Sequence, residues 1–232
     1  MTLQVHNIDT FYGTSHILHG ISLDIADGEL SAILGRNGAG KTTLLRSIAG
    51  VNPPSQGSIV LDGKEIAHLK SHRRTWLGIS YVPQGREIIP DITVAENIYV
   101  ALLGKGQKAK KVPEFVFDYF PALKPLMALK GGVLSGGQQQ QLAIARALVQ
   151  QPKLLLMDEP TEGLQPSVVE EIEPIIKRIP NERKCAVLLV EQNLDFVRAI
   201  TQKFTILDTG RIVASGDIGQ LTSDVVHRHL AM

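Results

Sequence analysis

GRNGAGKT, residues 35–42, lies between a short apolar run, Leu30–Leu34, and a helix-like segment, Lys41–Ala49. Its three glycines allow the backbone to turn tightly and to point successive N–H groups inward, where they can bind phosphate oxygens. The helix that follows contributes its positive N-terminal end. The order of apolar run, glycine-rich turn and helix therefore predicts a phosphate-binding loop rather than a simple connecting turn.

Two side chains of this loop and two later carboxylates supply the predicted chemistry. Lys41 would reach the β- and γ-phosphates of a nucleotide, and the Thr42 hydroxyl would ligate Mg²⁺, a hard cation that takes oxygen ligands. Asp158 and Glu159 follow the apolar run Leu154–Met157, which places them at the carboxyl end of a buried strand, where open α/β sheets bind ligands. Asp158 would hold Mg²⁺, directly or through water, and Glu159 would orient and deprotonate the attacking water.

The bulk composition argues against two classes of protein. Lys plus Arg number 24 and Asp plus Glu number 23, so the net charge of +1 lacks the footprint of a nucleic-acid binder. The basic stretches His72–Arg74 and Lys108–Lys111 are interpreted as solvated loop faces. No apolar run approaches the ~20 residues that span a bilayer, and the N-terminus lacks signal-peptide features. We expect a cytosolic protein with one buried thiol, Cys185, that meets a membrane only through a partner.

The order of apolar patterns predicts an α/β fold. Strand-like runs occur at Leu3–Ile8, 17–25, Gly57–Leu61 and Ile79–Val82. From about Pro83 to Gln150 the pattern becomes helical, with Thr93–Leu103 and Pro113–Phe120 as the main segments, and we interpret this region as an inserted helical subdomain. Beyond it, buried-strand runs at Leu154–Met157 and Ala186–Val190 alternate with helical patterns at Ser167–Ile179 and Leu194–Ile200. This alternation is typical of a parallel sheet covered by helices.

Two further motifs fit a nucleotide site. Ser135, Gly136, Gly137 and Gln138 precede a helical pattern, so they present a hydroxyl and close backbone N–H groups beside a helix N-terminus, a second place where phosphate can bind. The aromatic pair Phe11-Tyr12 allows two interpretations: one ring stacks on an adenine base, or it folds onto the core as a turn residue.

Taken in order, these motifs resemble the ATP-binding subunit of an ABC transporter, and the resemblance covers essentially the whole chain. The ordered set is Tyr12, the loop from Gly35 to Thr43, a glutamine loop at Gln84, the LSGGQ signature at Leu134–Gln138, and Asp158-Glu159. The resemblance implies ATP and Mg²⁺ as cofactors. The nucleotide-binding residues that it implies are Tyr12, Gly35, Asn37, Gly38, Ala39, Gly40, Lys41, Thr42, Thr43, Gln84, Ser135, Gly136, Gly137 and Gln138. Those implied at Mg²⁺ are Thr42, Gln84 and Asp158.

The resemblance also implies an architecture and partners. It implies a P-loop ATPase, one ABC ATPase domain over 1–232, with a mainly parallel core sheet, an N-terminal antiparallel β subdomain and a helical subdomain at about 83–150. Two such subunits pair head to tail, so that each ATP lies between the loop of one and the signature of the other. The pair works with transmembrane permease subunits at the cytoplasmic face of the membrane, and indirectly with an external solute-binding protein.

Two positions depart from the common family pattern. Gln192, in Val190-Glu191-Gln192-Asn193, takes the place of the usual histidine; its amide can donate to a γ-phosphate oxygen but cannot carry charge or relay a proton. Gln165 replaces the aspartate that normally spans the dimer interface. The resemblance implies catalytic roles for Lys41, Glu159 and Gln192, and the departures bear on the hydrolysis rate rather than on ATP binding.

The same stretches resemble one subgroup, the ATPases that power uptake of branched-chain amino acids and of urea or short-chain amides. The stretches that carry this likeness are Val82–Pro90, Gly136–Leu148, Pro160–Ser167 and Val190–Asn193. The second and third favour the urea-type subunit over the branched-chain amino acid type. The subgroup implies a heterodimer of two different ATPase subunits, with a homodimer as the alternative. An ATP-gated interaction module with weak hydrolysis is a second hypothesis, and a nucleic-acid or ribosome ATPase a third, which the near-neutral charge disfavours.

Overall fold

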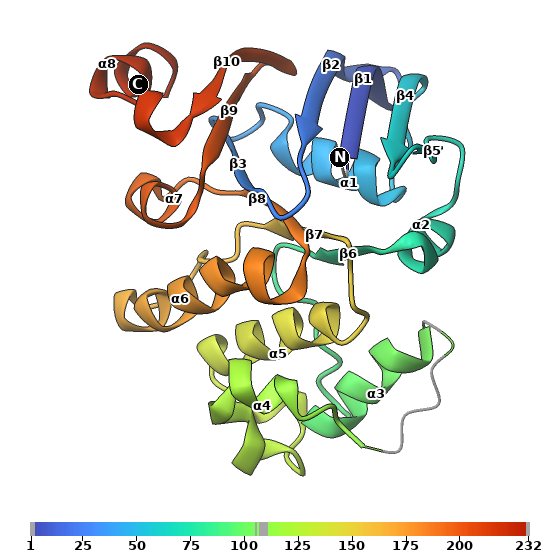
Figure 1. Cartoon of the computed structure of the whole chain (residues 1–232), viewed down its shortest axis with the longest axis vertical. Helices are drawn as coiled ribbons and strands as arrows, with labels where there is room; N and C mark the ends of the chain where they lie inside the picture. The colour runs from blue at the N-terminus through green and yellow to red at the C-terminus, as the bar shows by residue number, and fades with distance from the viewer. Residues whose placement is uncertain (1–2, 105, 107–110, 231–232) are drawn as a thin grey trace.

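The computed structural model describes residues 3–104, 106 and 111–230, which contain two β-sheets and the helices around them (Figure 1). The larger sheet has the order β10-β9-β3-β8-β7-β6, with bounds Arg211–Asp217, Lys203–Asp208, Leu30–Leu34, Ala186–Val190, Leu154–Asp158 and Ile79–Val82. The smaller sheet has the order β2-β1-β4-β5, with bounds Ser15–Ile25, Leu3–Tyr12, Gln56–Leu61 and Lys64–Glu65. The pairs that join β9, β3, β8, β7 and β6 are parallel, β10 is antiparallel to β9, and the pairs of the smaller sheet are antiparallel.

Helices fill the connections between these strands. The α-helices are α1 (Lys41–Ala49), α2 (Ser71–Leu77), α3 (Val94–Gly104), α4 (Phe115–Tyr119), α5 (Gly136–Leu148), α6 (Pro166–Arg183), α7 (Leu194–Ile200) and α8 (Ser223–His229). Short 3-10 turns occur at Pro121–Leu126, Gly131–Val133 and Ile218–Gln220.

The strands β3, β7 and β8 are buried along their whole lengths, which is why they read as continuous apolar runs. Side chains alternate between the two faces of the sheet: Leu154 and Leu156 belong to the hydrophobic cluster on the α1 side, and Leu155 and Met157 to the cluster on the other side. Strand β7 therefore lies between two hydrophobic clusters and places Asp158 at the carboxyl edge of the sheet.

The phosphate-loop helix α1 lies between the two sheets (Figure 1). Its residues Leu44, Leu45 and Ile48 are fully buried and pack with the inner faces of the smaller sheet and of β7 and β8. A helix clamped on two sides has little freedom to shift, so its N-terminus is held firmly at the carboxyl end of β3.

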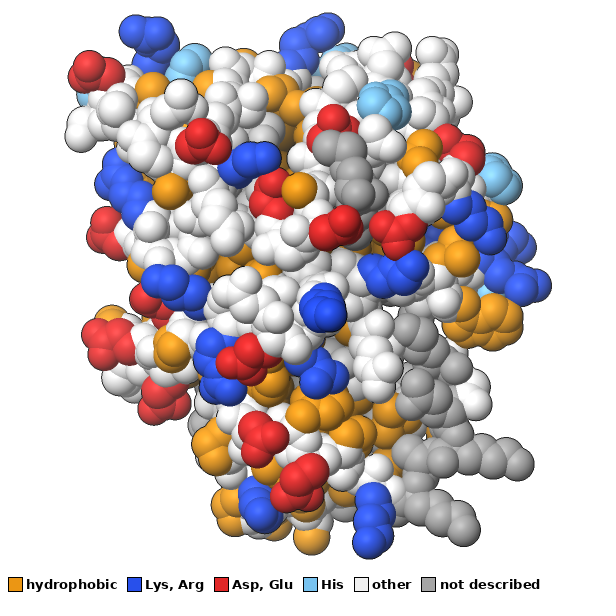
Figure 2. All heavy atoms as spheres, in the orientation of Figure 1, with side chains coloured by type: hydrophobic (Ala, Val, Ile, Leu, Met, Phe, Trp, Pro, Cys, Tyr) orange, Lys and Arg blue, Asp and Glu red, His pale blue; other side chains and the backbone are white. Residues whose placement is uncertain are grey.

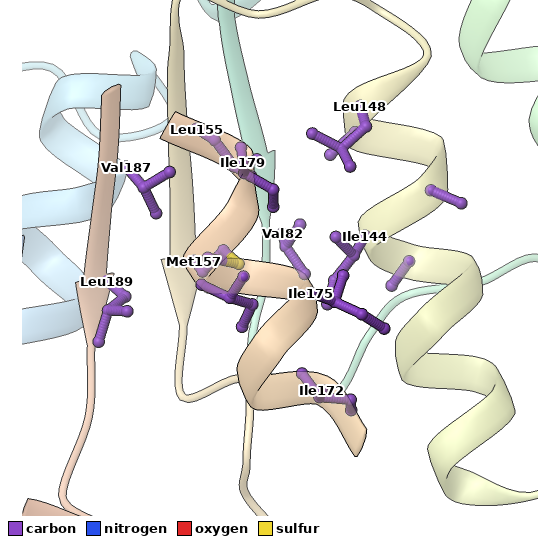
Figure 3. Packing of buried hydrophobic residues seen from close by; sticks show 14 of the residues in the cluster. Val82, Ile144, Leu148, Leu155, Met157, Ile172, Ile175, Ile179, Val187 and Leu189 are labelled. Atoms are coloured by element: carbon purple, nitrogen blue, oxygen red, sulfur yellow. The ribbon is translucent and has the colours of Figure 1, made fainter. Parts of the chain in front are cut away.

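Helices α5 and α6 cover the opposite face of the larger sheet. Figure 3 shows Ile144 and Leu148 of α5 and three isoleucines of α6 pointing at β6, β7 and β8. Helix α3 packs against α5. Helix α4 lies near α5, on the side away from the larger sheet (Figure 1). This second core carries the start of α5, where the serine and glycine motif lies.

The predicted α/β architecture, with a mainly parallel sheet and an antiparallel β-sheet near the N-terminus, is confirmed. The thiol of Cys185 is fully buried, as expected, and burial raises its pKa to about 12. Tyr12 ends strand β1 instead of lying in a loop between strands. Part of the basic stretch at 108–111 falls outside the described residues.

The hairpin of β9 and β10 was not predicted. Its turn is the dipeptide Thr209-Gly210, with both residues at positive φ, which matches the twist of a tight hairpin. A Cβ at Gly210 would lie 1.9 Å from the carbonyl oxygen of Ile17, so only glycine fits there. The turn dipeptide was the available signal for this hairpin.

The interpretation of 72–74 as a solvated loop face was wrong for the loop and for Arg74, although His72 and Arg73 are exposed. These residues lie in α2, and Arg74 is fully buried. Its guanidinium donates to four backbone carbonyls: Leu69 at 2.9 Å, Ser47 at 2.7 Å, Ile48 at 2.9 Å and Ala67 at 2.7 Å. The Ser47 and Ile48 carbonyls belong to the last turn of α1, the helix that follows the phosphate loop. The positive guanidinium of Arg74 therefore lies at the negative end of that helix. Burial lowers the pKa of Arg74 to about 10.

Charge and hydropathy on the surface agree with the composition. On the face shown in Figure 2, acidic and basic side chains are interspersed over most of the surface. Within residues 3–104, 106 and 111–230, no helix combines the length and the apolar composition that crossing a bilayer requires.

Replacing Arg74 by Met is expected to lower the free energy of unfolding by about 2–4 kcal/mol, because four buried carbonyls lose their donor. Urea unfolding followed by circular dichroism measures this change. The control is Arg73→Ala on the same helix, since Arg73 is exposed and faces the Trp76 ring at 5.0 Å. An Arg74→Met protein as stable as the Arg73→Ala protein would show that the carbonyl cluster contributes little.

Candidate functional site

The loop 35–42 joins the carboxyl end of β3 to α1 through three glycines at positive φ. Gly35 has φ 150° and Gly40 has φ 103°, and a Cβ at Gly35 would lie 2.3 Å from the carbonyl oxygen of Leu207. Gly40 is the N-cap residue of α1, and no side chain caps the helix, whose first turn also lacks an acidic residue. The first N–H groups of α1 are therefore left for an external acceptor, which fits a phosphate.

Lys41 lies at the bottom of this loop. Its ammonium donates to the carbonyls of Gly35 (2.8 Å) and Arg36 (3.1 Å) and stands 4.0 Å from a carboxylate oxygen of Glu159. The side chain is 5% exposed, and burial lowers its pKa, while Glu159 and Asp158 act in the opposite direction. The loop thus holds a cation close to the predicted acidic pair.

Asp158 is held on both carboxylate oxygens. The Thr42 hydroxyl donates to Oδ1 at 3.1 Å, and the Tyr81 hydroxyl donates to Oδ2 at 3.0 Å. Asp158 is 1% exposed, and burial raises its pKa although both hydrogen bonds lower it. Sequence reasoning missed Tyr81, whose only signal was its place in β6 beside β7.

The pair Thr42 and Asp158 fits Mg²⁺. Mg²⁺ in nucleotide sites takes one or two protein oxygens and fills its remaining positions with phosphate and water oxygens. A hydroxyl and a buried carboxylate side by side supply that donor set. Within the described part of the chain, no group of three or more His, Cys, Asp or Glu residues forms a self-sufficient metal cage, so a metal here depends on the substrate's oxygens.

Glu159 and Gln192 meet although they are 33 residues apart in sequence. The Gln192 amide donates to Glu159 Oε1 at 2.8 Å and to Asn37 Oδ1 at 3.0 Å. The three residues come from the ends of β7 and β8 and from the phosphate loop. Glu159 adopts φ 48°, a conformation that costs a non-glycine residue free energy and that is concentrated at functional sites.

Glu191 fixes the segment that carries Gln192, a role that sequence reasoning missed. It is 2% exposed, and its Oε1 accepts from the Thr161 hydroxyl at 2.6 Å and from the Thr161 N–H at 2.9 Å. Its Oε2 accepts from the N–H groups of Gln192 and Asn193. A charged residue directly after a fully apolar strand was the available signal.

The aromatic pair at the end of β1 takes two different positions. Phe11 stacks on the His16 ring, with ring centroids 4.1 Å apart. Tyr12 is 44% exposed, and its hydroxyl interacts with Arg46 of α1 and raises the pKa of that guanidinium. Tyr12 is therefore available for stacking with a base, and it is connected to the loop helix.

Gln84 does not contact the pair Thr42 and Asp158 by any hydrogen bond among the described residues. Its amide N–H donates to Glu162 Oε2 at 3.0 Å, which ties the glutamine loop to the segment after β7. Its amide oxygen remains an acceptor, the atom by which a glutamine ligates a metal.

The signature segment caps α5 within its own subunit. Ser135 accepts from the Gln138 N–H at 3.3 Å, and the Ser135 N–H donates to the Gln138 side chain at 3.0 Å, so the two form a capping box. A Cβ at Gly137 would lie 2.5 Å from a methyl of Val168. In the described residues, no hydrogen bond joins this segment to the loop at 35–43. The site therefore has two separate parts.

Comparison with known proteins agrees with this geometry. The family model described as ABC transporter matches residues 18–162. The branched-chain amino acid transport ATP-binding protein LivF of Archaeoglobus fulgidus is 36% identical over 231 residues, 99% of this chain and 98% of that protein. The high-affinity branched-chain amino acid transport ATP-binding protein BraG of Pseudomonas aeruginosa is 37% identical over 212 residues, 91% of each. A dimeric ATP-binding cassette solved in a post-hydrolysis state with ADP and Pi superposes with a TM-score of 0.83 at 26% identity, covering 93% of this chain and 98% of that one.

Asp158→Asn is expected to raise the thermal midpoint of the protein without nucleotide or Mg²⁺ at pH 7.5. Because burial raises the folded-state pKa of Asp158, the folded state binds its proton more tightly than the unfolded state. The carboxylate therefore destabilises the fold above its folded pKa, and this penalty disappears as pH falls through that pKa towards the unfolded value. The gain from Asn should shrink accordingly at acid pH.

Differential scanning calorimetry across a pH series measures this effect, and Asp91→Asn, at an exposed position, is the control. A midpoint that falls at pH 7.5 in the Asp158→Asn protein would contradict the prediction.

Proposed function

The chain belongs to the ABC transporter family, and from this premise we propose that it is the ATP-hydrolysing subunit of an importer of branched-chain amino acids. ATP hydrolysis coupled to transport is the activity of the family, and its cassettes dimerise and work with transmembrane permease subunits. The proposal assigns the roles of individual residues, the partner arrangement and the transported solute.

The meeting of Glu159 with Gln192 beside Lys41 carries the catalytic part of the proposal. Lys41 and the free N–H groups of α1 bind the phosphates. Thr42 and Asp158 hold Mg²⁺, which neutralises phosphate charge when bound. Glu159 accepts the proton of the attacking water. The Gln192 amide holds the Glu159 carboxylate with one N–H, and its other N–H moves from Asn37 to the γ-phosphate.

A second subunit completes the site in this proposal. Among the described residues, no hydrogen bond joins the signature segment at Leu134–Gln138 to the loop of the same subunit. A cavity of about 460 Å³ lies beside the loop, against residues 34–37 and helix α8, and in the described chain its lining includes no residue of 38–43. We assign the cover of the loop's phosphate side to a partner's signature segment. A heterodimer of paralogous subunits, together with permeases and an external binding protein, is the proposed working assembly at the cytoplasmic face.

The solute is proposed from the relatives. Two proteins named for branched-chain amino acid transport match at 36% and 37% identity over nearly the full length of both partners. Urea remains a second candidate because the stretches Gly136–Leu148 and Pro160–Ser167 resemble the urea-type subunit. The relatives favour the branched-chain amino acids, against the preference for urea that those stretches gave.

A different class of function is favoured by a separate observation. The Gln192 side chain is neutral, and its amide donates to Glu159 and Asn37, so it can hold Glu159 without relaying a proton. An ATP-gated interaction module would bind ATP and dimerise with little hydrolysis. Single-turnover hydrolysis by the complete transporter separates the two, since a silent complex would favour the module.

Glu159→Gln is expected to lower the rate of ATP hydrolysis by about 10²–10⁴-fold, because an amide cannot accept the proton of the attacking water. ATP-driven dimerisation should persist, since Gln keeps the shape of the side chain. Phosphate release measures turnover, and light scattering with and without ATP measures dimerisation.

The control for this variant is Glu170→Gln, which removes an exposed carboxylate of α6. A Glu159→Gln protein that hydrolyses ATP as fast as the Glu170→Gln protein would remove Glu159 from the role of base.

The complex reconstituted in vesicles with its permeases and binding protein is expected to accumulate labelled leucine when ATP is present. Excess isoleucine should compete with leucine, and excess urea should not. The same complex carrying Glu159→Gln provides the zero-uptake control. Accumulation of labelled urea without leucine would overturn the branched-chain assignment in favour of the second candidate.

A further inference from the structure

Both oxygens of the Asp158 carboxylate are held by donors from different elements. Thr42 is on α1, and Tyr81 is on β6. The side-chain torsion next to a carboxylate is broad and roughly two-fold, so one hydrogen bond leaves the group free to turn. Two donors on opposite oxygens fix its plane.

A second residue on the face of α1 that carries Thr42, Arg46, lies beside Tyr81. Arg46 follows Thr42 by four residues, so the two side chains lie one above the other on the helix. The hydroxyls of Tyr12 and Tyr81 interact with the Arg46 guanidinium and raise its pKa. One face of α1 therefore contacts Asp158 Oδ1 directly and Oδ2 through Tyr81.

The chemistry of each group allows this chain of contacts. A phenol has one donor and two acceptor positions, and a guanidinium has only donors. Tyr81 therefore gives its proton to Asp158 and can accept from Arg46, and Tyr12 can accept from the same guanidinium. The planar fork of an arginine can reach two hydroxyls at once, which a lysine ammonium does less well.

The geometry of β6 explains why Tyr81 is in reach. Strands β6 and β7 are parallel neighbours, with Tyr81 opposite Leu156 and Val82 opposite Met157. Tyr81 is half-buried and packs on the cluster that contains α1. Its ring thus lies between the helix and the end of β7, with its hydroxyl at Asp158.

We propose that Tyr81 and Arg46 are positioning residues: Tyr81 fixes the plane of the Asp158 carboxylate, and Arg46 links that carboxylate to Tyr12. This inference rests on the proposed function, in which Asp158 serves Mg²⁺ and Tyr12 serves the nucleobase. The contacts join the two ends of a bound Mg-nucleotide through protein groups. One face of α1 therefore positions both Asp158, which serves Mg²⁺, and Tyr12, which serves the nucleobase.

The test compares nucleotide binding in excess EDTA with binding in saturating Mg²⁺, using a fluorescent ATP analogue. Tyr81→Phe keeps the ring and removes only the hydroxyl. It is expected to leave the Kd in EDTA unchanged and to weaken the Kd in Mg²⁺ about five- to tenfold, the size of an ordinary hydrogen bond. The Mg²⁺ concentration for half-maximal hydrolysis should rise by a similar factor, with little change in kcat at saturation.

Arg46 variants test the link. Arg46→Met should give the same loss of Mg²⁺-dependent affinity as Tyr81→Phe, and the double variant should lose no more than either alone, because both act on one carboxylate. Arg46→Lys should restore part of the loss. Full additivity of Tyr81→Phe and Arg46→Met would overturn the link between the two residues.

The control is Tyr99→Phe, on helix α3 and packed against the other hydrophobic cluster. If the wild type binds the analogue more tightly with Mg²⁺ and Tyr81→Phe behaves like Tyr99→Phe, the inference is wrong and the proposed function stands. If Tyr81→Phe weakens binding equally in EDTA and in Mg²⁺, Tyr81 has a packing role and the inference is again wrong. A wild type that does not bind the analogue under either condition overturns the proposed function itself.

Discussion

The placement of helix α1 between two sheets is the constraint on which the rest of the site depends. The antiparallel sheet covers one side of α1 and strands β7 and β8 cover the other, with Leu44, Leu45 and Ile48 fully buried between them. At its C-terminal end, Arg74 donates to the last carbonyls of the helix. With both sides and the far end of α1 fixed, its N-terminal N–H groups point at one place in space, and the glycine loop bends around that place.

The sequence predicted those parts of the fold whose signals are local. The continuous apolar runs of β3, β7 and β8, the glycine loop and the acidic pair all depend on adjacent residues, and the structure has them where they were expected. The hairpin of β9 and β10 was missed because its strands alternate weakly and only the dipeptide Thr209-Gly210 marks them. The stretch 72–74 was misread because a charged run is usually solvated, and burial of Arg74 depends on carbonyls more than twenty residues away.

The residues of the site also divide into those with a local sequence signal and those that depend on contacts between distant segments. The loop lysine, Thr42, Asp158 and Glu159 are recognisable by spacing, and the structure brings them together. The residues that orient them are not recognisable in this way, since Tyr81, Glu191 and Arg46 act through contacts between elements that only the fold makes adjacent. Nor does the site specify the solute, because a cassette of this kind holds nucleotide and not cargo. That identity comes from relatives, which is an argument by likeness.

The capping box at Ser135 is compatible with a site that spans two subunits. The Ser135 hydroxyl oxygen accepts from the Gln138 N–H, which uses one of its two acceptor positions and leaves its O–H free to donate. The following N–H groups of α5 have no acidic residue in the first turn to neutralise them. The cap therefore stiffens the helix start and still offers a donor and a positive helix end to an anion. The loop at 35–42 likewise offers unpaired donors at the start of α1. Two helix N-termini whose first turns carry no acidic residue are complementary to one polyphosphate placed between two subunits.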